Sequence, residues 1–237
     1  MFEPFESETS KIVTEAPAVA VIPPNAAASR LSEPFVSKAE EVAKRIGVKT
    51  SDVLGVIHFE TAGTMDPQKI NPLSGAIGLI QWTPAGVRAT NQKVNELGIE
   101  PIPCCNVIDI QTFLKGKTAE QQLDYTVAYI EASRCGRSIN NMGDLYLTVF
   151  APVALGKSDD YIAYQKDLTS PGSLKDRQYT QNKGMDINND GKITKAEILR
   201  RVQGRNNQFI RYDKSAPVQV VSSTYTGYVP PVPPLKT

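Results

Sequence analysis

Residues 52–84, DVLGVIHFETAGTMDPQKINPLSGAIGLIQWTP, form the stretch on which the fold depends. Residues 53–59 are apolar on nearly all sides and predict a buried helix, which ends on a single carboxylate, Glu60. Turn-forming residues follow, and then a run of small and apolar residues, SGAIGLIQ at 74–81. This order predicts an acidic side chain at the end of a central helix, facing a glycine-containing wall.

The flanking sequence predicts further helices and has no alternating strand pattern. Two capping boxes, in which a serine or threonine and an acid or amide three residues later satisfy first-turn amides, predict helix starts at Ser37 and Thr118. Pro84 is typical of a first helical turn, and residues 143–149 predict another short apolar helix. The expected fold class is therefore mostly α, with a helical domain at residues 33–168.

Both ends of the chain differ from this helical part. Residues 1–32 contain a Pro/Ala-rich segment without a helical or strand period, and residues 211–237 end in a polyproline-like run. We expect both to be extended arms that contact partner proteins. The net charge of +1 gives no electrostatic case for nucleic acid, and no run of about 18 apolar residues predicts a transmembrane helix.

The three cysteines are Cys104, Cys105 and Cys135. Neighbouring cysteines rarely bridge each other, so we expect at most one disulfide, to Cys135, and favour three free thiols. The chain has no C-x-x-C pair, and its single histidine, His58, cannot supply a zinc site. Because His58 lies two residues before Glu60, on a helix it points away from that carboxylate and is expected to be a packed side chain.

Residues 186–197, DINNDGKITKAE, match the twelve-residue calcium loop of an EF-hand. Oxygen ligands are expected from six residues: Asp186, Asn188, Asp190, Lys192 through its carbonyl, Thr194 and Glu197. Gly191 allows the sharp turn, and the alternative is a degenerate loop held by hydrogen bonds alone. Since no second loop is present, a calcium switch is not favoured. We expect a structural Ca²⁺ that fixes residues 169–210 against the helical domain.

Glu60 is a candidate acid for glycoside cleavage, because burial raises the pKa of a carboxyl and keeps it protonated near neutral pH. Gly75 and Gly78 would let a sugar approach the backbone, and the Gln81 amide could hold a hydroxyl or N-acetyl group. Each feature also has an ordinary structural interpretation, namely a glutamate that turns to the surface and a glycine segment that packs tightly. Trp82 could stack on a sugar or belong to the core.

Together, these residues resemble the two leading motifs of the soluble lytic transglycosylase and goose-type lysozyme superfamily. The motifs here are Glu60-Thr61 and SGAIGLIQ, and the resemblance covers roughly residues 50–155, including Tyr129, where a helix tyrosine is common. It implies a lysozyme-like (SLT) helical fold with Glu60 as the catalytic residue. It also implies substrate contacts from Thr61, Ser74, Gly75, Gly78, Gln81 and Tyr129.

The chain departs from this family where the third motif, A-Y-N-A-G or similar, would stand. Residues 150–156 read FAPVALG and lack the tyrosine and the asparagine. Such divergence looks like the phage-encoded branch, and the N-terminus lacks the basic start and apolar run of a signal peptide. The resemblance therefore implies a virion protein of the phage tail or baseplate that degrades peptidoglycan in the host periplasm.

Two mechanisms compete for the bond between N-acetylmuramic acid and N-acetylglucosamine. In a lytic transglycosylase, Glu60 alone acts as acid and then as base, and leaves a 1,6-anhydro end. An inverting muramidase needs a second carboxylate about 6.5–9.5 Å away. Asp66 is the only nearby acid, and a turn role before Pro67 suits it better, so we favour the transglycosylase. A virion protein that keeps the fold without activity is the main alternative, and a calcium-regulated adaptor is the weakest.

Overall fold

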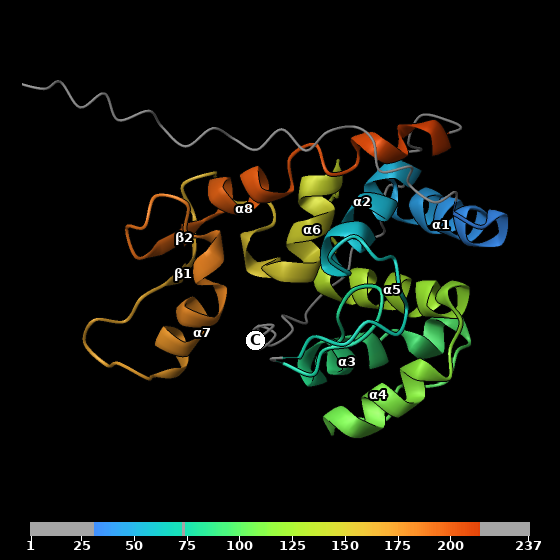
Figure 1. Cartoon of the computed structure of the whole chain (residues 1–237), viewed down its shortest axis with the longest axis horizontal. Coiled ribbons are helices and arrows are strands. Elements are labelled where there is room, and N and C mark those ends of the chain that lie inside the picture. The colour runs from blue at the N-terminus through green and yellow to red at the C-terminus, as the bar shows by residue number, and fades with distance from the viewer. Residues whose placement is uncertain (1–30, 73, 214–237) are drawn as a thin grey trace, which may run out of the picture. The chain divides into compact units, whose positions relative to one another are not determined.

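The structure, a computed structural model, describes residues 31–72 and 74–213, which belong to one compact unit (Figure 1). The α-helices of this part are α1 (Glu33–Ile46), α2 (Thr50–Glu60), α3 (Pro84–Asn91), α4 (Val107–Lys115), α5 (Ala119–Arg134), α6 (Met142–Phe150), α7 (Leu174–Asn182) and α8 (Lys195–Val202). The 3₁₀ turns are η1 (Val94–Leu97), η2 (Pro152–Ala154), η3 (Lys183–Met185) and η4 (Asn207–Tyr212). The described chain is mostly helical, as expected.

The predicted arms fall largely outside the described residues. Residues 1–30 and 214–237 are not described, so the expectations of extended, partner-binding ends stay predictions. The boundary expected at residue 211 falls inside η4, which packs on α2. Asp213, the last described residue, accepts hydrogen bonds from the Ser51 amide at 2.8 Å and the Ser51 hydroxyl at 2.9 Å. The helical part therefore extends past that boundary.

Helix α1 begins earlier than the sequence predicted. It starts at Glu33, with Pro34 in its first turn, so the expected capping box at Ser37 is wrong. A proline suits the first turn because that turn needs no amide donor at its position. The earlier start adds Phe35 and Val36 to the buried face of the helix. Gly47 ends it with φ of 90°, a backbone conformation that favours glycine.

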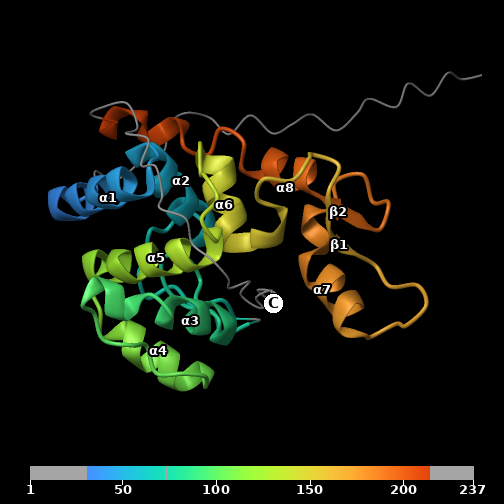
Figure 2. The same ribbon diagram turned by 180° about the vertical axis from the view of Figure 1, so that it is seen from behind.

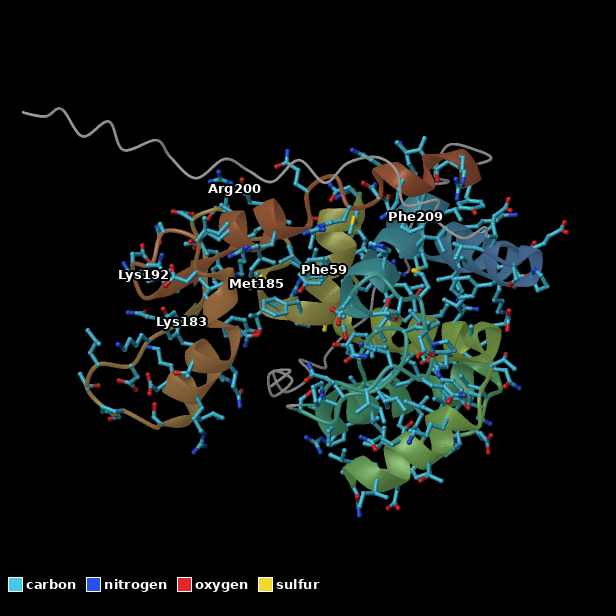
Figure 3. The ribbon with its side chains drawn as sticks, viewed as in Figure 1. Phe59, Lys183, Met185, Lys192, Arg200 and Phe209 are labelled. Atoms are coloured by element: carbon cyan, nitrogen blue, oxygen red, sulfur yellow. A yellow bond between two sulfur atoms is a disulfide. The ribbon has the colours of Figure 1, made fainter. Side chains whose placement is uncertain are left out.

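Helix α2 is the central element, as its apolar sequence predicted. Every residue from Thr50 to Ile57 is buried. It contacts α1, α6 and η4, and the η4 residue Phe209, labelled in Figure 3, meets the His58 ring edge-to-face at 5.5 Å. Because the helix is buried on all sides as far as Ile57, its packing fixes the position of the last turn, which ends at Glu60.

The described residues between Thr61 and Ala76 form a loop, as expected, and the loop continues to Thr83 before the chain returns to helix at Pro84. Within the loop, Ile77 makes isolated bridges to Ile70 and Trp82. The capping box that opens α5 is confirmed, because Thr118 and the Gln121 side chain satisfy each other's amides. Helix α5 contacts α1, α3 and α6 and so joins the first helices to the later ones.

The second half adds a small mixed unit to the helices. Strand β1 (Ile162–Gln165) pairs antiparallel with β2 (Lys192–Thr194), and α7 contacts β1 beside this ladder (Figure 2). The loop 186–197 runs from η3 through β2 into α8. Helix α8 contacts α6, and both η2 and the aromatic side chain of Tyr164 connect β1 to the end of α6.

The cysteine expectation is corrected by the structure. Cys104 and Cys105 are joined in a disulfide across a cis peptide bond, with their Cα atoms 3.1 Å apart, and Cys135 is a free thiol. The expected partner, Cys135, lies at the C-terminal end of α5, where it takes a left-handed conformation and caps that helix. No helix in the described residues is long and apolar enough to cross a membrane.

Candidate functional site

Glu60 is the last residue of α2 and is half-buried. Two buried tyrosines lie close to it: Tyr129 of α5 and Tyr146 of α6. Burial raises the pKa of both phenols, and the nearby Glu60 carboxylate adds to this effect. Both phenols therefore stay protonated through the neutral range. The structure thus brings Glu60 together with Tyr129, which the resemblance placed among the site residues, and adds Tyr146.

An aromatic wall extends from Glu60 across three elements. We define it as Phe59, Tyr146, Phe150 and Tyr164. Phe59 meets Tyr146 edge-to-face at 5.1 Å, Tyr146 stacks on Phe150 at 5.4 Å, and Phe150 meets Tyr164 edge-to-face at 5.7 Å. Edge-to-face and stacked rings at these spacings add directional attraction to the burial of their apolar surface. The wall therefore connects α2, α6 and β1 in one contact chain.

Two buried phenols anchor the C-terminal end of α6. The Tyr129 hydroxyl donates to the Val149 carbonyl at 3.0 Å, and the Tyr164 hydroxyl donates to the Phe150 carbonyl at 2.9 Å. These are carbonyls of the last helical turn, which has no partners within the helix. The Tyr129 hydroxyl is consequently used inside the fold, at the position where the resemblance implied a substrate contact.

Gln81 is also turned inward. It is buried, takes a positive φ of 55°, and donates its side-chain amide to the carbonyls of Lys69 and Gly78 at 3.1 and 3.0 Å. Buried amides are costly unless their donors are satisfied, so these bonds hold the loop in one conformation. In this arrangement the Gln81 nitrogen braces the loop that carries the second motif.

The glycines of the second motif are required by close packing. Gly75 and Gly78 have φ of 70° and 87°. A Cβ at Gly75 would lie 2.7 Å from a Val107 methyl group, and one at Gly78 would lie 2.6 Å from the Gln122 side-chain oxygen. The packing interpretation of these residues therefore holds in the structure, because a helix side chain occupies the space beside each of them.

Gln122 is a functional neighbour that the sequence did not reveal. It is fully buried on α5, and its oxygen accepts from the Leu79 amide at 3.1 Å. Its nitrogen donates to the carbonyls of Pro67 and Leu114 at 2.7 and 3.0 Å. This one side chain joins the loop after Glu60 to the second motif and to α4. Its only sequence signal is a polar residue within the apolar face of a helix.

The remaining motif residues are local supports. Thr61 is fully buried; its hydroxyl donates to the Ile57 carbonyl at 2.7 Å and accepts from the Met65 amide at 3.0 Å. The Ser74 hydroxyl accepts from the Ala76 amide at 3.1 Å. Trp82 is buried in the core, with its indole N–H donating to Thr90, so the core interpretation is confirmed over sugar stacking.

Asp66 and His58 have ordinary structural surroundings. Asp66 is exposed and accepts from the Gln68 amide at 2.8 Å, which is the turn role that the sequence favoured. His58 packs on Phe209 and lies within 3.4 Å of the Gln208 amide nitrogen. Burial, with a contribution from Arg205, lowers the pKa of His58. Both residues support the fold beside Glu60.

The loop 186–197 collects oxygen atoms from separate positions. Asp186 is buried and accepts from the Gly191 amide at 3.0 Å and the Tyr179 hydroxyl at 2.6 Å. Its burial alone would raise its pKa, but these hydrogen bonds and those from the loop amides outweigh burial and lower the pKa of this carboxyl. The same Asp186 bond raises the pKa of Tyr179 to about 12.

Glu197 draws the two ends of this loop together. One carboxylate oxygen accepts from the Ile187 amide at 2.9 Å, and the other accepts from the amide and hydroxyl of Thr194 at 2.9 and 2.8 Å. Burial would raise the pKa of Glu197, but these hydrogen bonds lower it. Between these ends, the exposed Asn188 and Asp190 contact each other at 3.1 Å. The first and last expected ligands are therefore fixed in place by the loop itself.

The donor chemistry of the loop fits a hard cation. Its side chains offer carboxylate, amide and hydroxyl oxygens, which calcium prefers, and Gly191 makes the required turn with φ of 83°. In the described part of the chain, no three His, Cys, Asp or Glu side chains lie together as a metal-holding group. An asparagine, a threonine and a main-chain carbonyl complete the expected set, so the fit rests on mixed oxygen donors.

Comparison with models of protein families, with curated proteins and with solved structures finds no match for this chain. Its function is therefore inferred from the geometry of Glu60 and of the loop 186–197.

Proposed function

We propose that this chain cleaves the glycan strands of peptidoglycan, with Glu60 as its catalytic acid and base. The observation that carries the proposal is the position of Glu60 at the end of a helix that is buried from Thr50 to Ile57, beside the aromatic wall and the phenols of Tyr129 and Tyr146. The resemblance of residues 50–155 to lytic transglycosylases supplies the substrate class. A lysozyme-like fold and a calcium-holding EF-hand loop belong to the same proposal.

The proposed reaction has two proton transfers at one carboxyl group. Glu60 first gives its proton to the oxygen that leaves C1 of N-acetylmuramic acid, and the glycosidic bond breaks. The resulting carboxylate then takes the proton of the C6 hydroxyl of the same sugar, whose oxygen bonds to C1 and closes the 1,6-anhydro ring. Glu60 ends protonated, as it began. Asp66, exposed and engaged in its turn, supports this one-carboxylate mechanism over an inverting hydrolysis.

The phenols beside Glu60 contribute position rather than proton transfer. Tyr129 is bonded to the Val149 carbonyl, and the pKa of each phenol is raised by burial and by Glu60, so neither ionises when Glu60 is a carboxylate. Because both tyrosines are buried, the proposal assigns to their rings the exclusion of water from the side of the carboxyl group that faces them. Exclusion of water strengthens the interactions of a charge that appears during the reaction.

Calcium enters the proposal as a structural ion. It would be held by six oxygen donors of the loop: Asp186, Asn188, Asp190, the Lys192 carbonyl, Thr194 and Glu197. The positive charge of the ion would stabilise the loop and would take no part in the chemistry at the substrate. The setting proposed for the whole chain is a phage tail or baseplate, which delivers the enzyme to the cell wall. Detection of the chain in purified particles by mass spectrometry tests that setting.

A second function is favoured by one observation. Most residues of the implied substrate site are engaged within the fold. The side chains of Gln81, Tyr129 and Thr61 donate hydrogen bonds to main-chain carbonyls, and neighbouring side chains pack closely against Gly75 and Gly78. A virion protein that retains the fold as a scaffold would need these internal contacts and no others. The two functions differ in one measurable property, which is cleavage of the glycan.

Zymography on purified cell wall tests the enzyme directly. Wild-type protein should clear the wall, and Glu60→Gln should lose about 10²–10⁴-fold of this activity while keeping its thermal unfolding midpoint. Asp66→Asn is the matched control and should clear like wild type. Mass spectrometry should find 1,6-anhydro ends; reducing ends would point to a muramidase. An inactive wild-type protein would leave the scaffold function standing.

A further inference from the structure

The segment after α6 connects the two candidate sites of the molecule. Residues 150–156 stand where the family's third motif would be, and residues 157–161 lead from there into β1. This segment contributes Phe150 to the aromatic wall at one end, and at the other end the Tyr161 carbonyl accepts from the Lys195 amide of the loop 186–197. Its position therefore depends on both sites.

The first link is the strand ladder. Tyr164 of β1 pairs with Ile193 of β2, which is fully buried within the loop, and the Lys166 amide donates to the Gly191 carbonyl at 2.8 Å. The Tyr164 side chain then reaches the other way, to the Phe150 carbonyl at 2.9 Å and the Phe150 ring. One residue thus contacts the loop through its backbone and the aromatic wall through its side chain.

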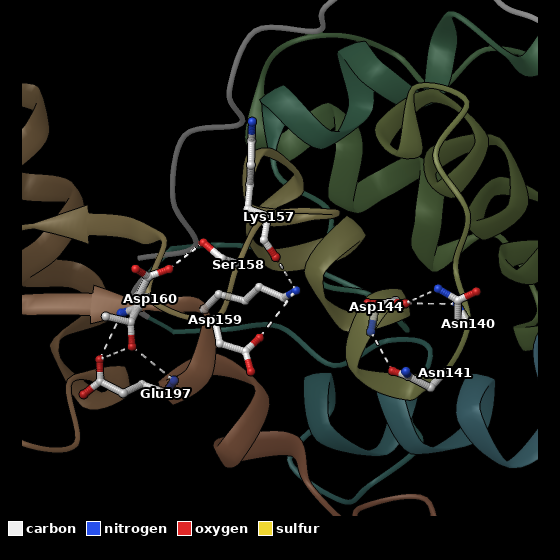
Figure 4. A network of polar contacts seen from close by, with 10 residues as sticks. Asn140, Asn141, Asp144, Lys157, Ser158, Asp159, Asp160 and Glu197 are labelled. Atoms are coloured by element: carbon white, nitrogen blue, oxygen red, sulfur yellow. Dashed lines mark hydrogen bonds and ion pairs between the residues drawn. The ribbon is translucent and has the colours of Figure 1, made fainter.

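The second link is the start of α8. The Lys195 ammonium group donates to the Lys157 carbonyl at 2.7 Å and lies 3.6 Å from the Asp159 carboxylate (Figure 4). The Lys195 amide donates to the Tyr161 carbonyl, and the Ala196 amide donates to the Asp159 carbonyl. Glu197, the last expected calcium ligand, caps this same helical turn through Thr194.

We propose that the loop 186–197 is a positioning device for the Glu60 site, and that Tyr164 is the residue through which it acts. Calcium held by the loop fixes β2 and the first turn of α8, and these fix residues 157–164. Tyr164 then holds the Phe150 carbonyl and the aromatic wall beside Glu60. The role in catalysis rests on the proposed function, whereas the coupling between loop and wall does not.

The geometry gives a reason for the altered third motif. A segment that reads FAPVALG lacks polar side chains with which to fix itself. Two of its carbonyls instead accept from distant donors: the Tyr164 hydroxyl donates to the Phe150 carbonyl, and the Arg137 guanidinium donates to the Pro152 carbonyl at 2.8 Å. Tyr164 is the donor among these that belongs to the strand paired with the loop.

Hydrogen exchange with and without calcium tests the coupling independently of activity. In wild-type protein, calcium added after treatment with a chelator should slow amide exchange in the loop and also in residues 146–165. Tyr164→Phe keeps the ring but removes the hydroxyl. It should bind calcium with unchanged affinity by calorimetry, while the slowing at residues 146–156 is lost. Tyr161→Phe, on the same segment, is the matched control and should behave like wild type.

Kinetics on peptidoglycan fragments then test positioning. Loss of one neutral hydrogen bond beside the wall predicts a roughly five- to tenfold lower kcat for Tyr164→Phe with little change in KM. Calcium should raise kcat in the wild type and not in this variant.

The proposal is overturned if calcium does not bind, or if it slows exchange in the loop but leaves residues 146–156 unchanged in the wild type. If calcium does slow exchange there and no cleavage occurs, the coupling stands and the proposed function fails.

Discussion

Residues 60–81 and residues 186–197 both carry a motif, but their polar side chains face different surroundings. In the first segment, Gln81 is buried and donates to two carbonyls of its own loop. In the second, Asn188 and Asp190 are exposed, and their side-chain oxygens accept hydrogen bonds from N–H groups of the same loop. The first motif is therefore buried within its own loop, whereas the second keeps two of the proposed calcium ligands at the surface.

The same contrast applies to the glycines of the two segments. Gly78 is pressed against Gln122 and the Trp82 ring, whereas a Cβ at Gly191 would meet only the Lys166 Cβ at 3.7 Å. Both have positive φ, so both turns favour glycine. The comparison shows that motif residues which look alike in sequence can be selected by packing in one place and by turn conformation in another.

The largest expected effect is that of a methyl group at Gly78. Gly78→Ala should lower the free energy of unfolding by about 3 kcal/mol, because it adds a left-handed alanine to a steric clash. Gln122 cannot move aside, since its oxygen and nitrogen are bonded to Leu79, Pro67 and Leu114. Urea unfolding measures the difference.

Gly191→Ala separates the two causes. It has the positive φ without the clash, so its cost should be about 1–2 kcal/mol. Gly184→Ala, at a position without positive φ or a neighbour within 4 Å, is the control and should change stability by less than about 0.5 kcal/mol. Equal costs at Gly78 and Gly191 would show that packing does not distinguish the two segments.

The next largest effect comes from replacing a side-chain amide by a carboxylate in each of the two segments. Gln81→Glu replaces a buried donor by a carboxylate that faces two carbonyl oxygens, and should cost about 2–3 kcal/mol of stability at neutral pH. Asn188→Asp adds a negative oxygen to the proposed calcium loop and should raise calcium affinity several-fold, because affinity rises with ligand charge.

The midpoints of thermal unfolding, measured with and without calcium, test both variants. Gln81→Glu should melt at a lower temperature in either condition, and Asn188→Asp should gain a larger calcium-dependent increase in its midpoint than the wild type. A stabilised Gln81→Glu, or a calcium response that does not change in Asn188→Asp, would contradict the roles assigned to the two segments.

Local signals were enough to predict most of the helices. The apolar run before Glu60, Pro84 in a first turn and the capping box at Thr118 each act within a few residues, and each is confirmed. The start at Ser37 was wrong because two signals lay close together, and the proline at position 34 combined with the buried Phe35 outweighed the serine. Local sequence signals therefore predict the first residue of a helix only where two such signals do not compete.

The surroundings of Glu60 were only partly predictable. Its place at the end of a buried helix followed from the sequence, whereas Tyr129 entered the predicted site only through the family resemblance. The aromatic wall did not follow from the sequence, because Tyr146 and Tyr164 reach it from distant elements and only tertiary packing brings them together. Tyr164 lies in a strand of four residues, too short for a periodic pattern.

The smallest expected effect concerns His58, where the end of the described chain meets the helix that carries Glu60. Burial first, and Arg205 second, lower the pKa of His58 in the folded state. As pH falls below about 6.5, the ordinary pKa of histidine, His58 takes up a proton in the unfolded chain. In the folded chain it takes up this proton only at a lower pH. The stability contributed by neutral His58 is present above that pH and is lost as pH falls through the folded pKa.

His58→Gln isolates this dependence, because the chain has no other histidine. As pH falls from about 7.5 to about 5, the wild type should lose up to about 1 kcal/mol relative to the variant, a small amount because the ring is half-exposed. The carboxylates titrate equally in both proteins, so the difference between their urea midpoints reports His58 alone. Parallel curves over this range would show that η4 does not hold His58 neutral. A widening gap would show that the packing of Phe209 against α2 persists in solution, beside the helix end on which Glu60 depends.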